Sequence, residues 1–122
     1  MTTPPVENLP ANPTIPLTPD LRAAYQDLYN KIQAAIDSTM DLATVEALNT
    51  WQPEVEQVLT KDDEYKLSAD TAIFAALQKQ INYANAGLKV LRDQISSIAS
   101  HFALAGDIIA GIDKVLSFFP AP

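Results

Sequence analysis

The 122-residue chain contains no cysteine and a single histidine, His101. Without cysteine it has no disulfide, no thiolate zinc or iron–sulfur site and no thiol nucleophile. One histidine excludes a multi-histidine metal site and disfavours a hydrolytic Ser-His-Asp triad. We therefore expect a non-enzymatic protein with no catalytic residues, no metal and no cofactor.

Glycine is also scarce, and no glycine-based motif occurs: there is no phosphate-binding loop, dinucleotide fingerprint or Gly-x-Ser-x-Gly elbow. The nearest approach to a cation site is the run Asp62-Asp63-Glu64. Calcium loops place their oxygen ligands at staggered positions and usually turn on a glycine, whereas these acids are consecutive and lack one. We interpret the run as part of a solvated loop. His101 has no acid at helical spacing and is expected to be a cap or surface residue.

Positive charge is in short supply, with eight basic residues against fifteen acidic ones and a net charge of -7. Residues 1–64 hold eleven acids and three bases, and residues 65–122 hold four acids and five bases. A negative field repels nucleic acids and anionic lipids and attracts basic surfaces. The charge asymmetry therefore favours a basic protein partner, although acidic surfaces also serve solubility alone.

Proline, in contrast, is concentrated at the N-terminus, where six of the nine prolines fall within residues 1–19. Four of them recur at every third position, which matches the three-residue turn of a polyproline II helix: Pro10, Pro13, Pro16 and Pro19. Residues 1–18 are predicted to form an extended arm. The arm is either a ligand for a proline-binding domain or a leader that packs on the body or stays mobile. We favour the leader, because such ligands usually carry a nearby base and the nearest is Arg22.

The first helix is predicted to begin at Thr18-Pro19-Asp20 and to end near Asp37. Threonine is a good N-cap, proline suits the first helical position, and aspartate meets the positive end of the helix dipole. A second helix is predicted from about Leu42, after capping by residues such as Asp41. Pro53 predicts a kink or short break near residues 50–53, and the polar residues 60–67 are predicted to form a loop.

The strongest periodicity predicts one helix over about residues 69–101. Its apolar residues, from Ile73 to Phe102, keep three-and-four spacing without a phase slip. This stripe consists of Ile73, Leu77, Ile81, Ala84, Leu88, Leu91, Ile95, Ile98 and Phe102. Gly87 inside it predicts close approach of another helix or a local bend. A break at Ala105-Gly106-Asp107 would open a last helix, and a single helix running to Phe119 is the alternative.

Together these patterns predict an all-α protein: an up-down helical bundle of about four helices in residues 19–122, with one long central helix. The short connections favour antiparallel neighbours. No alternating strand pattern and no Asn-Gly or Asp-Gly hairpin turn is present. The long helix, coiled-coil-like in its spacing, is expected to leave part of its stripe uncovered, which motivates a homodimer or a partner groove.

The leading functional hypothesis is an adaptor, inhibitor or immunity-type protein that binds a basic partner. Its expected contact surface is the acidic segment formed by Asp41, Glu46, Glu54, Glu56, Asp62, Asp63 and Glu64. The alternative is a lipid- or membrane-interacting protein that acts through the apolar residues 102–119, although such helices are usually cationic on their polar side. No basic segment precedes an apolar run at the start, so we expect a cytoplasmic protein, with non-classical export left open.

Overall fold

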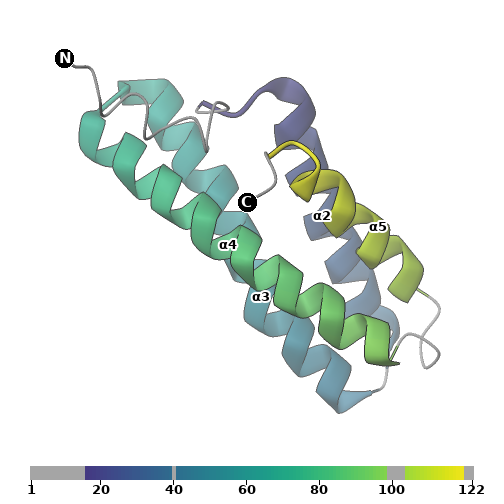
Figure 1. Ribbon diagram of the computed structural model, residues 1–122. Coiled ribbons are helices and arrows are strands. Elements are labelled where there is room, and N and C mark those ends of the chain that lie inside the picture. The colour runs from purple at the N-terminus through teal and green to yellow at the C-terminus, as the bar shows by residue number, and fades with distance from the viewer. Residues whose placement is uncertain (1–15, 40, 99–103, 120–122) are drawn as a thin grey trace.

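Four helices account for most of the computed structural model, which describes residues 16–39, 41–98 and 104–119. They are α2 (Pro19–Ser38), α3 (Leu42–Ser68), α4 (Thr71–Ile98) and α5 (Ala105–Leu116) (Figure 1). These described segments contain no strand. The all-α helical prediction is confirmed, whereas the arm predicted over residues 1–18 lies outside the described residues except for its last three.

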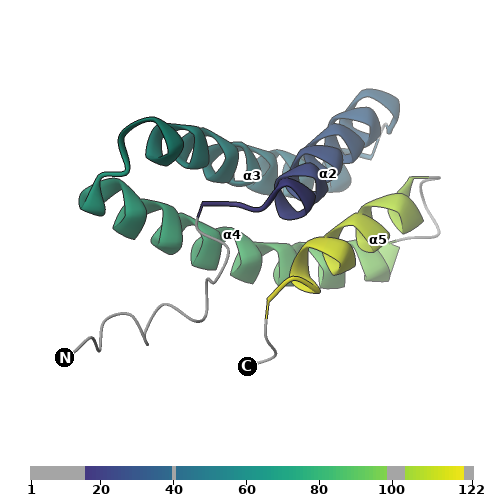
Figure 2. The same ribbon diagram turned by 90° about the horizontal axis from the view of Figure 1, so that it is seen from above.

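The helices form a closed ring around one core. α3 packs against α2 and α4, and α5 packs against the same two helices from the other side. The views in Figures 1 and 2 show the long helices α3 and α4 side by side, with α2 and α5 laid across part of their length. Because α2 and α5 are shorter, the end of the α3–α4 pair where the two helices join extends past them.

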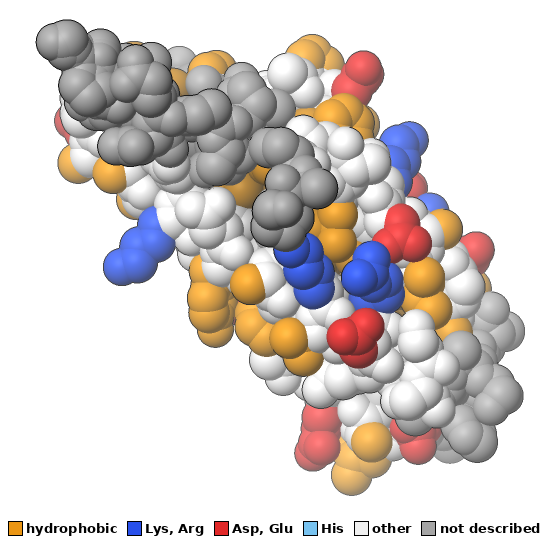
Figure 3. Space-filling model, in the orientation of Figure 1, with side chains coloured by type: hydrophobic (Ala, Val, Ile, Leu, Met, Phe, Trp, Pro, Cys, Tyr) orange, Lys and Arg blue, Asp and Glu red, His pale blue; other side chains and the backbone are white. Residues whose placement is uncertain are grey.

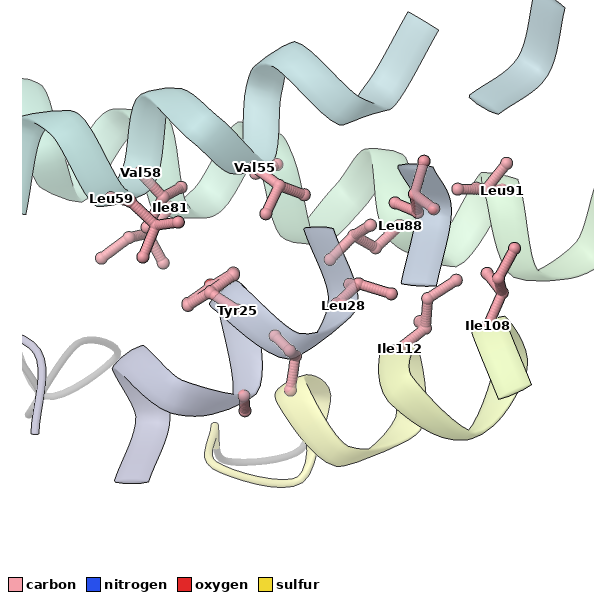
Figure 4. Close-up of a cluster of buried hydrophobic side chains, with 14 of the residues drawn as sticks. Tyr25, Leu28, Val55, Val58, Leu59, Ile81, Leu88, Leu91, Ile108 and Ile112 are labelled. Carbon is pink, nitrogen blue, oxygen red and sulfur yellow. The ribbon is translucent and has the colours of Figure 1, made fainter. Parts of the chain in front are cut away.

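Each helix contributes fully buried side chains to this core, among them Leu28 of α2, Val55 of α3, Leu88 of α4 and Ile112 of α5 (Figure 4). The stripe predicted on the long helix is inside it: from Leu77 to Ile95 every member is inaccessible to solvent. We had expected part of this stripe to lie uncovered and to offer a surface for a homodimer. No uncovered stripe residue is found between Leu77 and Ile95.

Side-chain caps set the beginnings of three helices. Thr18 Oγ1 accepts a hydrogen bond from the Leu21 amide at 3.2 Å, and Asp41 Oδ2 accepts one from Thr44 at 2.9 Å. Asp70 Oδ1 accepts one from the Ala72 amide at 2.7 Å. Each oxygen satisfies an amide that the first turn leaves without a partner, which is why these short polar residues define the helix starts.

One prediction about α3 is wrong: residues 60–67, predicted as a loop, are helical up to Ser68. The helix also continues through Pro53, which excludes the short break but not the kink that was predicted near residues 50–53. Pro53 lies on the exposed side of α3. Asp62 in this run turns inward, where the Leu17 amide and Arg22 bind it, and it also pairs with Lys66 one turn later, at 2.8 Å. A run of charges is compatible with a helix when one member is satisfied in the interior.

The end of the chain forms a separate helix, so the single helix to Phe119 is excluded. α5 packs back against α4, where Arg92 Nη1 lies 2.8 Å from Asp113 Oδ1. α5 begins one residue before Gly106, at Ala105, and Asp107 lies in its first turn. The prediction that Gly106 ends one helix and Asp107 caps the next is therefore wrong. His101 and Phe102 lie outside the described residues.

Gly87 is a point of close contact between α3 and α4, one of the two possibilities, close approach or a local bend, that its place inside the predicted helix raised. The Trp51 ring lies directly on it, so that a β-carbon at Gly87 would overlap the ring. The ring of Tyr83 packs beside Trp51 with centroids 5.4 Å apart. Trp51 is therefore an interhelical packing residue whose seat requires the absence of a side chain at position 87.

We expect Leu91→Ala to lower the free energy of unfolding by about 2–5 kcal/mol, because it empties space in the middle of the core. Leu67→Ala is the matched control, since Leu67 is 88% exposed and should change stability by less than about 0.5 kcal/mol. Chemical denaturation followed by circular dichroism measures both. Similar losses for the two variants would contradict the core described above.

Gly87→Ala should cost about 1–3 kcal/mol through overpacking against Trp51. Gly106→Ala is the control, because no atom lies within 4 Å of the added carbon, and we expect it to be neutral or slightly stabilising. In the Trp51→Ala background the cost of Gly87→Ala should largely disappear. An undiminished cost in that background would show that the Trp51 contact is not its cause.

Candidate functional site

The seven acidic residues of the predicted contact surface all lie on α3 or at its N-cap, yet the structure assigns them different roles. At 100° per residue they spread over several sides of the helix. One is buried, one is a cap, one is bound to α4, and the other four are exposed and have none of these roles. We take these four as the members available to a partner.

Asp62 is the buried one, with no solvent exposure. Its Oδ1 accepts a hydrogen bond from the Leu17 amide at 2.8 Å. Its Oδ2 lies 3.1 Å from Arg22 Nη1 and 2.8 Å from Lys66 Nζ. Burial of a carboxylate is tolerated when such donors satisfy it. The structure therefore removes Asp62 from the contact surface and makes it a structural link between the N-terminal segment, α2 and α3.

Two further acids are engaged within the fold. Asp41 caps α3 through its bond to the Thr44 amide. Glu54 Oε1 accepts a hydrogen bond from Gln80 Nε2 at 2.9 Å, which ties α3 to α4. Glu54 and Glu56, two residues apart, thus point to different sides of the helix, Glu54 toward α4 and Glu56 toward the α2 side.

The remaining four acids are Glu46, Glu56, Asp63 and Glu64, which we call the α3 acidic face. Within the described part of the chain, the carboxylates of Glu46, Glu56 and Glu64 have no ion-pair or hydrogen-bond partner, while Asp63 pairs with Arg22 at 3.1 Å. Glu46 and Glu64 are five turns apart on one side of α3, about 27 Å along the axis. The face is therefore long and carries unneutralised charge.

The charge of the neighbouring helix has the opposite sign. α3 contains six acidic and two basic residues, whereas α4 contains one acidic and three basic residues. The side of the molecule drawn in Figure 3, with α4 in front, shows both basic and acidic side chains among hydrophobic ones. Among the four helices, α3 carries the largest excess of acidic over basic residues.

A polar groove runs between α2 and α3 beside this face. It has a volume of about 230 Å³ and is lined by Arg22, Gln26, Tyr29, Glu56, Leu59, Thr60 and Asp63. The α2 side of this groove was not predicted from the sequence, although its spacing indicates a shared helix side. Arg22, Gln26 and Tyr29 follow the i, i+4, i+7 spacing of one side of a helix. Glu56, Thr60 and Asp63 follow the same spacing.

Within the part of the chain that the structure describes, no group of three or more His, Asp or Glu side chains converges as a metal site would require. Tyr25, whose side chain is fully buried, donates a hydrogen bond to Asn85 Oδ1 at 2.7 Å. Burial raises the pKa of Tyr25 and outweighs the opposing effect of that bond, so the phenol stays protonated and links α2 to α4.

The apolar residues of α5 are used inside the protein. Ile108, Ile112 and Val115 are fully buried, and Gly111 packs against Leu28 of α2. α5 is thus packed between two neighbouring helices, α2 and α4. None of the described helices has the length and apolarity that crossing a bilayer requires.

Comparisons with known protein families, curated proteins and solved structures found no match to this chain. The features that bear on its function are therefore the α3 acidic face and the adjoining groove.

Asp62→Asn should lower the free energy of unfolding by about 2 kcal/mol, because it weakens three hydrogen bonds to a buried carboxylate, two of them from cationic side chains. Asp63→Asn is the matched control: its side chain is 59% exposed, and a surface pair is worth about 0–1 kcal/mol. Urea titrations of the two variants measure the difference. Equal stabilities would mean that Asp62 has no structural role.

Proposed function

We propose that this protein is a non-enzymatic interaction protein that binds a basic protein partner through the α3 acidic face, as an adaptor, inhibitor or immunity-type binder. The observation that carries the proposal is the set of three carboxylates, Glu46, Glu56 and Glu64, left without a cation on one exposed helix. The ion pairs of the described residues lie at other carboxylates: Arg22 pairs with Asp62 and Asp63, and Lys66 pairs with Asp62. Lys31 pairs with Asp27, and Arg92 pairs with Asp113.

Charge of this kind acts mainly on association. Exposed carboxylates add little to folding, but a localised field can raise the rate of association with an oppositely charged surface by about 10-fold or more. The effect is screened when the Debye length falls to about 8 Å at physiological salt. Binding through the α3 acidic face should therefore depend steeply on ionic strength.

Several finer features belong to this proposal. The up-down order of the helices is inferred from their short connections, and the N-terminal arm is inferred from its prolines. A cytoplasmic location and a homodimer likewise stay predictions. The lipid-binding alternative is the less favoured one, because Ile108, Ile112 and Val115 would have to leave the core before α5 could present its apolar side to a membrane.

The test of the proposal replaces Glu46, Glu56 and Glu64 by glutamine and leaves Asp62 intact. The control replaces Asp20, Asp93 and Asp107 by asparagine, which changes the net charge equally at exposed positions on the other three helices. Wild type and both variants are used to capture proteins from a lysate of the native host at low and high salt. We expect a basic protein that binds wild type and control, is lost with the α3 variant, and is released by salt.

The association rate of that protein, measured by surface plasmon resonance, should fall by about 10-fold or more in the α3 variant, with a smaller change in dissociation. A partner whose binding is the same for all three proteins and at both salt concentrations would contradict the proposal. The α3 acidic face would then serve solubility alone.

A further inference from the structure

The α2–α3 groove is built from matched levels of side chains. Arg22 of α2 contacts Asp63 of α3, and Gln52 Nε2 donates to Gln33 Oε1 at 2.9 Å. Residue numbers rise along α2 as they fall along α3, so the two helices run antiparallel with a constant register. Midway between these contacts, the same register sets Tyr29 opposite Glu56, and both residues line the groove.

One level of the groove already holds a guanidinium. Arg22 Nη1 lies 3.1 Å from Asp63 Oδ1, and Nη2 lies 3.3 Å from Asp63 Oδ2, a two-point contact between a planar cation and a carboxylate. Arg22 also contacts Asp62, and its Nη1 lies 3.4 Å from the Leu59 carbonyl oxygen. Arg22 therefore bridges Asp62 and Asp63, and together with Lys66, which also pairs with Asp62, it balances both carboxylates at this level.

The Tyr29–Glu56 level has the carboxylate but no cation. Among the described residues nothing bonds to the Glu56 side chain, and no ion pair reaches it. With Asp63 two turns away, about 10.5 Å along α3, the groove has two carboxylates at its mouth. Tyr29 adds an aromatic ring, which guanidinium groups favour as a packing surface.

The size of the groove limits what can occupy it. Its volume of about 230 Å³ lies below the range of about 300–1,000 Å³ typical of pockets for drug-sized ligands and cofactors. Such a groove suits one extended side chain. Its negative excess selects a cation, and the aromatic ring beside the carboxylate favours arginine over lysine.

We propose that the α2–α3 groove is the specificity site of the α3 acidic face, and that it binds one arginine side chain of the basic partner between Tyr29 and Glu56. This inference rests on the proposed function and adds to it the residue type that is recognised. Glu46 and Glu64, outside the groove, supply only long-range attraction.

The test titrates the full-length, isotope-labelled protein with N-acetyl-L-arginine N-methylamide and follows the backbone amides by two-dimensional NMR. The corresponding citrulline amide, of the same shape but uncharged, is the ligand control. We expect saturable shifts around Tyr29, Glu56 and Thr60 with a dissociation constant on the order of 10 mM, because a single exposed pair is weak. The citrulline amide should leave the chemical shifts of these backbone amides unchanged.

Glu56→Gln should weaken arginine binding by about fivefold or more, whereas Glu46→Gln, the same change on the same helix, should not alter it. Tyr29→Leu, which keeps an apolar side chain, should weaken it by a smaller factor. Circular dichroism and melting checks that each variant is folded. Shifts that never saturate, that spread evenly over all acidic residues or that persist in Glu56→Gln would overturn the inference.

The two hypotheses fail separately. If arginine amide does not bind the groove but a basic partner still requires the α3 acidic face, the arginine site is wrong and the proposed function stands. If arginine amide binds at Tyr29 and Glu56 but no captured protein depends on the α3 carboxylates, the guanidinium site stands and the proposed partner class is overturned.

Discussion

The buried carboxylate of Asp62 is the interaction on which the arrangement of the helices most depends. A carboxylate without solvent exposure costs several kcal/mol unless donors replace its water. Here the donors come from the Leu17 amide, from Arg22 on α2 and from Lys66 on α3 itself. Any sliding of α2 along α3 would separate the Asp62 carboxylate from its donors. The two helices are therefore held in one register, whereas apolar packing alone would tolerate other registers.

That register has a consequence for the surface. With Arg22 fixed at Asp62 and Asp63, the chain of contacts continues to Gln33 and Gln52, and the space between is a polar groove rather than a filled interface. Arg22 is engaged by Asp62 and Asp63. The contact that positions α2 therefore occupies the cation beside the groove, and Glu46, Glu56 and Glu64 stay without an ion-pair partner among the described residues.

Much of the fold could be predicted from local signals, because helix caps and apolar periodicity act over a few residues. Thr18, Asp41 and Asp70 begin helices as short polar residues do, and the stripe from Leu77 to Ile95 is buried throughout. The loop predicted over residues 60–67 was wrong because its structure depends on distant contacts. A run of charged residues has the same composition in a loop and on a helix, and what decides is a partner 40 or 45 residues away, Arg22 or Leu17.

The candidate site shows the same division between local and distant information. The spacing of Glu56, Thr60 and Asp63, and that of Arg22, Gln26 and Tyr29, can each be read along the chain as one side of a helix. That the two sides face each other follows only from the register set at Asp62. The sequence therefore located a concentration of negative charge but treated its seven acids as equivalent. Tertiary contacts separate them: Asp62 is buried, Asp41 and Glu54 are engaged within the fold, and the other four are exposed.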